Sequence, residues 1–140
     1  MVQIIAGKKG KGKTKHLLDM ANAAIKGANG TVVYLDKSAQ HMYELNNKVR
    51  LINVKDYGIG NCDEFIGFVC GIISQDHDLE ELYFDSFLKI AGLEDGQDLL
   101  PVFNRLESIS ETFHIKITIS ISVDEHELPE EVKSKIIVSL

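Results

Sequence analysis

Residues 7–14 read Gly-Lys-Lys-Gly-Lys-Gly-Lys-Thr, so that Gly7 and Gly12 enclose four residues and Lys13 and Thr14 follow at once. The run that precedes them, Val-Gln-Ile-Ile-Ala at 2–6, is short and apolar, as is typical of a buried strand. The residues that follow carry apolar side chains at helical spacing. The sequence therefore predicts a strand, a glycine-rich loop and a helix in this order.

The residue types in this loop suit a ligand that carries several phosphate groups. Backbone N–H groups can wrap an anion closely only where no Cβ obstructs them, a condition that glycine meets. Lys13 supplies positive charge to the β- and γ-phosphates, Thr14 offers a hydroxyl to Mg2+, and the helix adds the positive end of its dipole. The predicted nucleotide-binding residues are Gly7, Lys8, Lys9, Gly10, Lys11, Gly12, Lys13, Thr14 and Lys15.

Length and composition indicate one domain over residues 1–140. The chain has 140 residues, of which 44% are hydrophobic, enough to bury a sizeable core. No apolar run approaches the ~20 residues of a membrane span, and a strand begins where a signal peptide would lie, so we expect a soluble, cytoplasmic protein. Cys62 and Cys70 form no C-x-x-C pair, and the five histidines lack ligand spacing, which argues against zinc or a disulfide.

Charge is distributed unevenly along the chain. Residues 1–50 hold nine Lys or Arg against three Asp or Glu, a balance of +6, whereas residues 51–140 hold six against eighteen, a balance of −12. Five of the lysines crowd the glycine-rich loop, which favours a polyphosphate but forms no extended stripe for nucleic acid. Nucleic acid is therefore an unfavoured partner.

Strand-type and helix-type segments alternate along the rest of the chain. The predicted strands are Val2–Ala6, Thr31–Leu35, Val49–Val54, Leu82–Asp85, Ile115–Val123 and Ile136–Val138. Helices are expected after the loop, after Asn61, after Asp98 and, as a short one, from Pro129. Such alternation predicts a three-layer α/β/α sandwich with a mostly parallel sheet and helices on both faces.

Two carboxylates follow apolar strands directly, Asp36 and Asp85. Ligands of parallel sheets bind at the carboxyl ends of the strands, so both are expected at the edge that holds the loop, together with the region around Ser120 to Asp124. At the end of its strand Asp85 can reach a water bound to Mg2+, and it joins Thr14 as a predicted metal residue. The acidic run Asp76, Asp78, Glu80 and Glu81 is interpreted as a solvated turn.

The chain resembles the P-loop nucleoside triphosphatases, specifically their RecA-like branch. The likeness extends from Val2 to about Ile121 and rests on the Gly7–Thr14 loop, the strand ending Tyr34-Leu35-Asp36, and Leu82-Tyr83-Phe84-Asp85-Ser86. The resemblance implies that the Leu82–Asp85 strand lies next to Ile115–Val123, which in turn flanks Val2–Ala6.

The sequence departs from this family at the positions that activate water. RecA-like enzymes usually carry a catalytic Glu soon after the second strand, but here no Glu occurs between Asp36 and Glu44. Asp36 is therefore the predicted catalytic base beside Lys13, with a structural role at a turn as the alternative. No Gln ends the Ile115–Val123 strand. Ser120, Ser122 and Asp124 stand there instead, either to sense the γ-phosphate or to cap the strand.

These observations predict a protein that binds a nucleoside triphosphate with Mg2+ and hydrolyses it slowly or with help from a protein partner or a second subunit. Arg50 and Arg105 are the only arginines, so an arginine finger within the chain is scarce. No Asn-Lys-x-Asp run for guanine is present, which favours ATP. The alternatives are a small-molecule kinase that uses Asp36 as its base, and a nucleotide-sensing module that does not hydrolyse.

Overall fold

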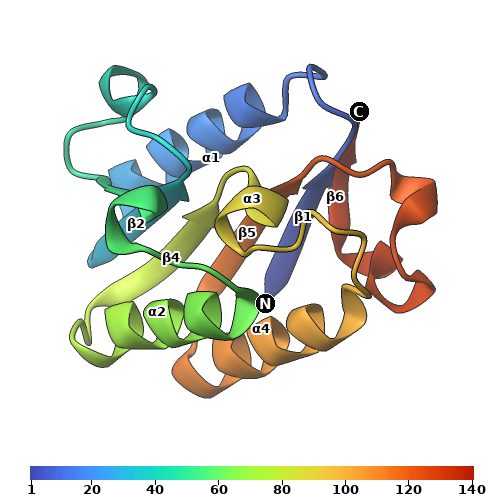
Figure 1. Ribbon diagram of the computed structural model, residues 1–140. Coiled ribbons are helices and arrows are strands. Elements are labelled where there is room, and N and C mark those ends of the chain that lie inside the picture. Colours follow the sequence, from blue (N-terminus) through green and yellow to red (C-terminus); the bar gives the residue numbers. More distant parts are fainter.

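The computed structural model describes all residues from Met1 to Leu140, and its centre is a sheet of six parallel strands (Figure 1). The strands are β1 Val2–Ala6, β2 Thr31–Asp36, β3 Arg50–Asn53, β4 Leu79–Phe84, β5 Lys116–Ile121 and β6 Ile136–Ser139. Their order across the sheet is β3-β2-β4-β5-β1-β6. The predicted neighbours β4, β5 and β1 are confirmed, because β5 pairs with both of the others.

Helices cover both faces of the sheet, as predicted (Figure 1). The α-helices are α1 Lys13–Gly27, α2 Cys62–Ser74, α3 Phe87–Ile90 and α4 Leu100–Phe113. Four short 3-10 helices join them, η1 Met42–Glu44, η2 Val54–Tyr57, η3 Glu125–Glu127 and η4 Glu130–Lys135. α1 packs on one face, whereas α2, α3 and α4 pack on the other, so the three-layer sandwich is confirmed.

Alternation of side chains along each strand divides the core between the two faces. In β1, Ile4 joins the core of 27 buried residues under α2 and α4, while Ile5 joins the core of nine under α1. A strand that is covered on both faces needs a nearly continuous apolar sequence, and β1 and β2 have one. This is why these strands could be recognised without any polar alternation.

Three expectations about elements need correction. β4 begins at Leu79 and not at Leu82, so Glu80 and Glu81 belong to a strand and not to a solvated turn. They are accommodated because the Glu80 carboxylate accepts the N–H of Gly30 and the Glu81 carboxylate accepts the Tyr83 hydroxyl at 2.7 Å. β5 is shorter than the predicted strand 115–123, and the segment after Pro129 is a 3-10 helix.

Helix starts were predicted closely but with one shift. Asn61 caps α2 by accepting the N–H of Glu64 at 2.9 Å, as the capping-box spacing indicates. Asp98 lies one residue before the cap position of α4, although its carboxylate accepts the N–H of Leu100 at 3.0 Å. The four-residue α3 was not predicted at all, because a single turn offers no helical period to detect.

A chain of aromatic side chains fixes α3 against the end of β4. The ring of Phe87 on α3 stacks on Phe84 with 6.2 Å between centroids and lies 5.8 Å from Phe103 of α4. Phe87 and Ile90 are both buried, so the turn after β4 is held firmly although it is short. None of the helices combines the length and apolar character that crossing a bilayer requires.

Candidate functional site

The loop between β1 and α1 leaves the first turn of α1 without a side-chain cap. Gly12 occupies the cap position with φ 91°, a left-handed conformation that favours glycine, and no side chain accepts the N–H groups of the first turn. That turn also contains no acidic residue. Free N–H groups at the positive end of a fifteen-residue helix form a site for an anion.

Lys13 turns inward from this loop. It is only 8% exposed, and its ammonium group donates to the carbonyl of Lys8 at 3.0 Å. Burial lowers the pKa of Lys13, while the negative charge of Asp85 opposes that shift. The structure thus holds a partly desolvated cation in the loop, where a phosphate would compensate it.

A cavity of about 580 Å³ opens beside the loop, at the carboxyl ends of the strands. It is lined by Lys9, Gly10, Gly12, Lys13, Thr14, Lys37, Asp85, Ser86, Leu88, Lys89, Glu94, Ser120 and Ser122. The structure therefore brings together the loop, Asp85 and the end of β5, which the sequence predicted to share one edge. Lys37, Leu88, Lys89 and Glu94 were not predicted.

Four of the predicted loop residues do not line this cavity. The N–H of Gly7 donates to the carbonyl of Val123 at 3.0 Å, and a Cβ there would come within 3.0 Å of Leu140. Lys8 lies 3.8 Å from Glu127 and Lys15 lies 3.7 Å from Asp19, both as exposed ion pairs, while Lys11 is exposed. Gly7 thus serves the close approach of the C-terminal strand.

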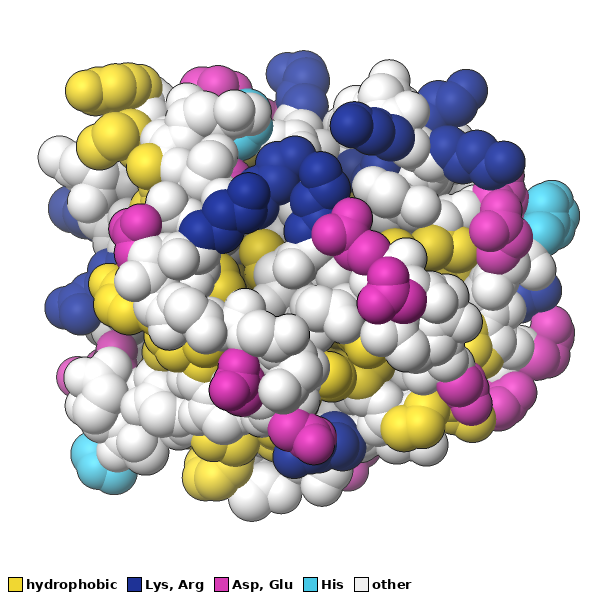
Figure 2. Space-filling view, in the orientation of Figure 1, with side chains coloured by type: hydrophobic (Ala, Val, Ile, Leu, Met, Phe, Trp, Pro, Cys, Tyr) yellow, Lys and Arg dark blue, Asp and Glu magenta, His cyan; other side chains and the backbone are white.

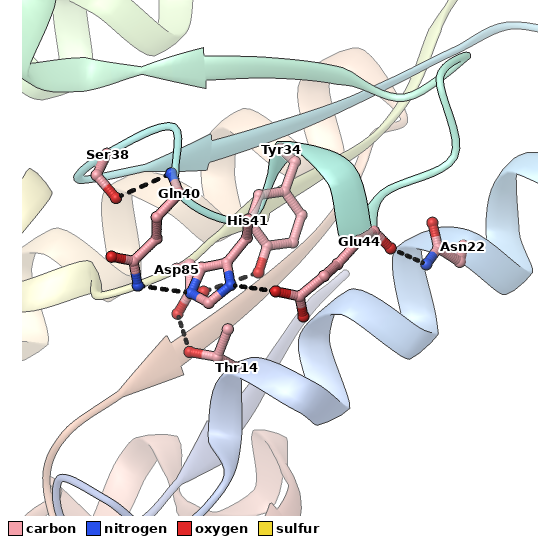
Figure 3. A network of polar contacts seen from close by, with 8 residues as sticks. All are labelled: Thr14, Asn22, Tyr34, Ser38, Gln40, His41, Glu44 and Asp85. Atoms are coloured by element: carbon pink, nitrogen blue, oxygen red, sulfur yellow. Dashed lines mark hydrogen bonds and ion pairs between the residues drawn. The ribbon is translucent and has the colours of Figure 1, made fainter.

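Asp85 is the centre of the polar network in the cavity (Figure 3). It is 2% exposed, and its Oδ1 accepts the hydroxyls of Ser120 at 2.7 Å and Thr14 at 3.3 Å. Its Oδ2 accepts the hydroxyl of Tyr34 at 2.8 Å. Burial, followed by the negative charge of Asp85, raises the pKa of Tyr34, which keeps this hydroxyl protonated as a donor.

The backbone after Asp85 is turned back on the carboxylate. Ser86 has φ 53°, which is uncommon for a residue other than glycine. In this conformation its N–H donates to Asp85 Oδ1 at 2.9 Å and to the Ser120 hydroxyl at 3.2 Å. A left-handed residue beside a buried carboxylate is the kind of local strain that collects at functional sites.

Asp36 is placed differently from expectation. It is 2% exposed and does not line the cavity; one oxygen accepts the N–H of Lys37 at 2.7 Å, and the other has no partner. Burial, followed by the nearby charge of Asp85, raises the pKa of Asp36 to about 6. The residue that faces the cavity after β2 is Lys37, so catalysis by Asp36 stays a prediction.

The segment after β2 folds beside the start of α1 (Figure 3). Its His41 Nδ1 lies 3.0 Å from the Glu44 carboxylate, and the Glu44 carbonyl accepts the amide of Asn22 on α1 at 2.9 Å. A second hollow of about 290 Å³ lies here, lined by Thr14, Lys15, Leu18, Asp19, His41 and Glu44. The first Glu after β2 is thus engaged with a histidine outside the main cavity.

One of the unpredicted residues, Lys37, could have been found by the rule that predicted Asp85. Lys37 directly follows β2, and strand ends point to the ligand edge of a parallel sheet. Lys89 gave no such signal, because its position depends on the single turn of α3. No group of three or more His, Cys, Asp or Glu side chains is arranged to hold a metal ion.

Comparison with solved structures identifies a similar fold. The crystal structure of flagellar accessory protein FlaH from Methanocaldococcus jannaschii matches with a TM-score of 0.55 at 20% sequence identity, over 95% of this chain. This chain spans 65% of the length of that one. At such identity the likeness concerns the fold alone, and it confirms the α/β architecture with its parallel sheet. No family model matches the chain, and no curated protein matches its sequence.

Proposed function

We propose that this chain binds a nucleoside triphosphate together with Mg2+, with ATP preferred, and hydrolyses it slowly or with help from a partner. One observation carries the proposal: the uncapped first turn of α1, the buried Lys13 and the Thr14–Asp85 pair all meet at one cavity. Free N–H groups and a desolvated ammonium recognise phosphates, and here they lie at the same cavity.

Thr14 and Asp85 are the residues that would hold Mg2+. Both present oxygen atoms, the ligands that Mg2+ prefers, and the chain provides no all-protein cage. This donor set fits an ion that takes its remaining ligands from phosphates and water. When bound, Mg2+ neutralises charge on the phosphates. Ser120, Tyr34 and the N–H of Ser86 keep the Asp85 carboxylate in one orientation.

Slow hydrolysis is proposed because the cavity is poor in bases. The only carboxylates that line it are Asp85, which already accepts four hydrogen bonds, and Glu94. Asp36 has a pKa suited to a base, but its carboxylate is buried outside the cavity. Lys13 can stabilise phosphate charge without activating water. We expect a single-turnover rate well below the ~1–100 s⁻¹ that is typical of kinases.

The same observation supports a second candidate, a nucleotide-sensing module that binds a triphosphate and leaves it intact. The two candidates differ in the fate of the nucleotide. Unchanged nucleotide after prolonged incubation, together with tight binding, supports the sensing module. Slow release of phosphate to water supports the hydrolase, and its acceleration by a cellular partner identifies the partner-dependent form.

Thermal unfolding in the presence of Mg-ATP, Mg-GTP and their diphosphates tests the proposal. A ligand at ~100 times its dissociation constant stabilises the folded state by ~2.7 kcal/mol, a rise in the unfolding midpoint of about 10 °C for a domain of this size. Lys13→Ala should remove most of this rise. Lys26→Ala is the matched control, because it removes the same charge from the exposed far end of α1. Absence of any shift with every nucleotide would refute the proposal.

A further inference from the structure

The cavity contains more positive charge than its own carboxylates neutralise. Four lysines line it, Lys9, Lys13, Lys37 and Lys89, against two carboxylates. Lys9, Lys37 and Lys89 take part in no ion pair within the chain. In Figure 2, Lys and Arg side chains gather over α3 and toward the glycine-rich loop. Unpaired cations around a hollow indicate a ligand with several negative charges.

Two of these lysines come from adjacent strand ends. Lys37 directly follows β2 and Lys89 lies on α3, which follows β4. β2 and β4 are neighbours in the sheet, and the N–H of Asp85 donates to the carbonyl of Leu35 at 2.8 Å, which continues the pairing to the edge of the cavity. The backbone at both sites is therefore fixed by the sheet and the core.

The two lysines line the same cavity, and their positive charges repel one another. Burial lowers the pKa of Lys37, and the neighbouring charges of Lys89 and then Lys9 lower it further. Phe87 and Ile90, on either side of Lys89, are buried in the core and prevent α3 from moving away. An anion placed between the lysines would offset this repulsion, so the arrangement favours binding of an anion.

We propose that Lys37 and Lys89 form a subsite for the terminal phosphate of the bound nucleoside triphosphate, an inference that rests on the proposed function. The subsite makes the chain bind triphosphates more tightly than diphosphates. Lys13 and Thr14 hold the phosphate chain from the α1 side, and the two lysines face the same cavity from the ends of β2 and β4. The γ-phosphate is present in a triphosphate and absent from a diphosphate, so two further cations that contact it would favour the triphosphate.

The arginines of the chain do not take this role. Arg105 on α4 pairs with Asp63 at 3.0 Å on the side of α2, and Arg50 lies at the start of β3, the edge strand. Neither lines the cavity. Charge on the terminal phosphate is therefore neutralised by lysines of the same chain. Since a protonated lysine cannot take a proton from water, the subsite favours a long-lived triphosphate complex.

Binding measurements on charge-neutral variants test the subsite. Dissociation constants for Mg-ATP and Mg-ADP are measured by calorimetry for the wild type, Lys37→Gln, Lys89→Gln and the double variant. Inorganic triphosphate and pyrophosphate serve as probes without a base. We expect the double variant to lose about 10-fold or more of its affinity for ATP and for inorganic triphosphate, with the affinity for ADP and pyrophosphate nearly unchanged.

A double Lys26→Gln, Lys55→Gln variant is the control, because it removes the same charge from exposed sites that do not line the cavity. Unliganded midpoints should not fall in the cavity variants, since the exposed Lys89 is removed from a repulsive contact. If the ratio of ATP to ADP affinity is unchanged in Lys89→Gln and in the double variant, the proposed subsite is refuted. This holds also if the lysines turn out to bind a different anionic ligand. If the wild type binds neither nucleotide, the proposed function fails as well.

Discussion

Replacing Asp36 by asparagine should change how the stability of the protein depends on pH. Asp36 is 2% exposed, one of its oxygens has no partner, and its pKa is raised from 3.8 to about 6 by burial and by Asp85. The folded state therefore binds this proton more tightly than the unfolded state does. The stability that the protonated carboxyl provides is complete below pH 3.8 and is lost as the pH rises toward 6.

The size of the effect follows from the shift. A difference of about two pKa units corresponds to about 3 kcal/mol, of which about 2 kcal/mol is lost between pH 4 and pH 7. Asp36→Asn removes the titration but keeps an oxygen that can accept the N–H of Lys37. The variant should therefore gain about 2 kcal/mol relative to the wild type over this range, whatever constant offset its amide group introduces.

Urea unfolding of both proteins at pH 4, 5, 6 and 7 measures this difference, because all other titrating groups are shared and cancel. The carbon chemical shift of the Asp36 carboxyl, followed by NMR, gives its pKa directly. Parallel pH profiles for the two proteins, or an Asp36 pKa near 4, would show that the carboxyl is hydrated and that our account of its burial is wrong.

Two other predictions concern stability at sites that the structure defines. Tyr34→Phe removes the hydroxyl that donates to buried Asp85 and should lower the free energy of unfolding by about 1–3 kcal/mol, as urea titration would show; an unchanged value would contradict the hydrogen bond. Gly30→Ala should destabilise strongly, because the new Cβ would lie 1.9 Å from the carbonyl oxygen of Asp78. Gly71→Ala, in the interior of α2 with no atom within 4 Å, should instead stabilise by about 0.5–1 kcal/mol, and equal effects of the two changes would refute the reasoning.

Where local chemistry determines a position, the sequence predicted which residues meet at the cavity. The spacing of Gly12, Lys13 and Thr14 can be recognised because free N–H groups, a cation and a hydroxyl must follow one another directly at the start of a helix. Asp85 was also found, since a carboxylate that ends an apolar strand of a parallel sheet points to the ligand edge. In both cases the signal lies within a few consecutive residues.

Other features of the site depend on residues that are distant in sequence. Whether Asp36 or Lys37 faces the cavity depends on the direction in which the chain leaves β2, and the pattern around them does not reveal it. Tyr34 of β2 donates to Asp85, which follows β4 directly, and the two residues are fifty-one positions apart in sequence.

By itself, then, the sequence determined the layered parallel fold, the glycine-rich loop and the carboxylate that faces the same cavity, because each follows from local periodicity or from one short motif. Only the tertiary structure decided which side chains share the cavity. Lys89 lines the cavity because the buried Phe87 anchors α3, whereas Asp36 is buried outside the cavity. Contacts between elements determine how α3 packs and in which direction the chain continues after β2. Such contacts leave no periodic pattern in the sequence.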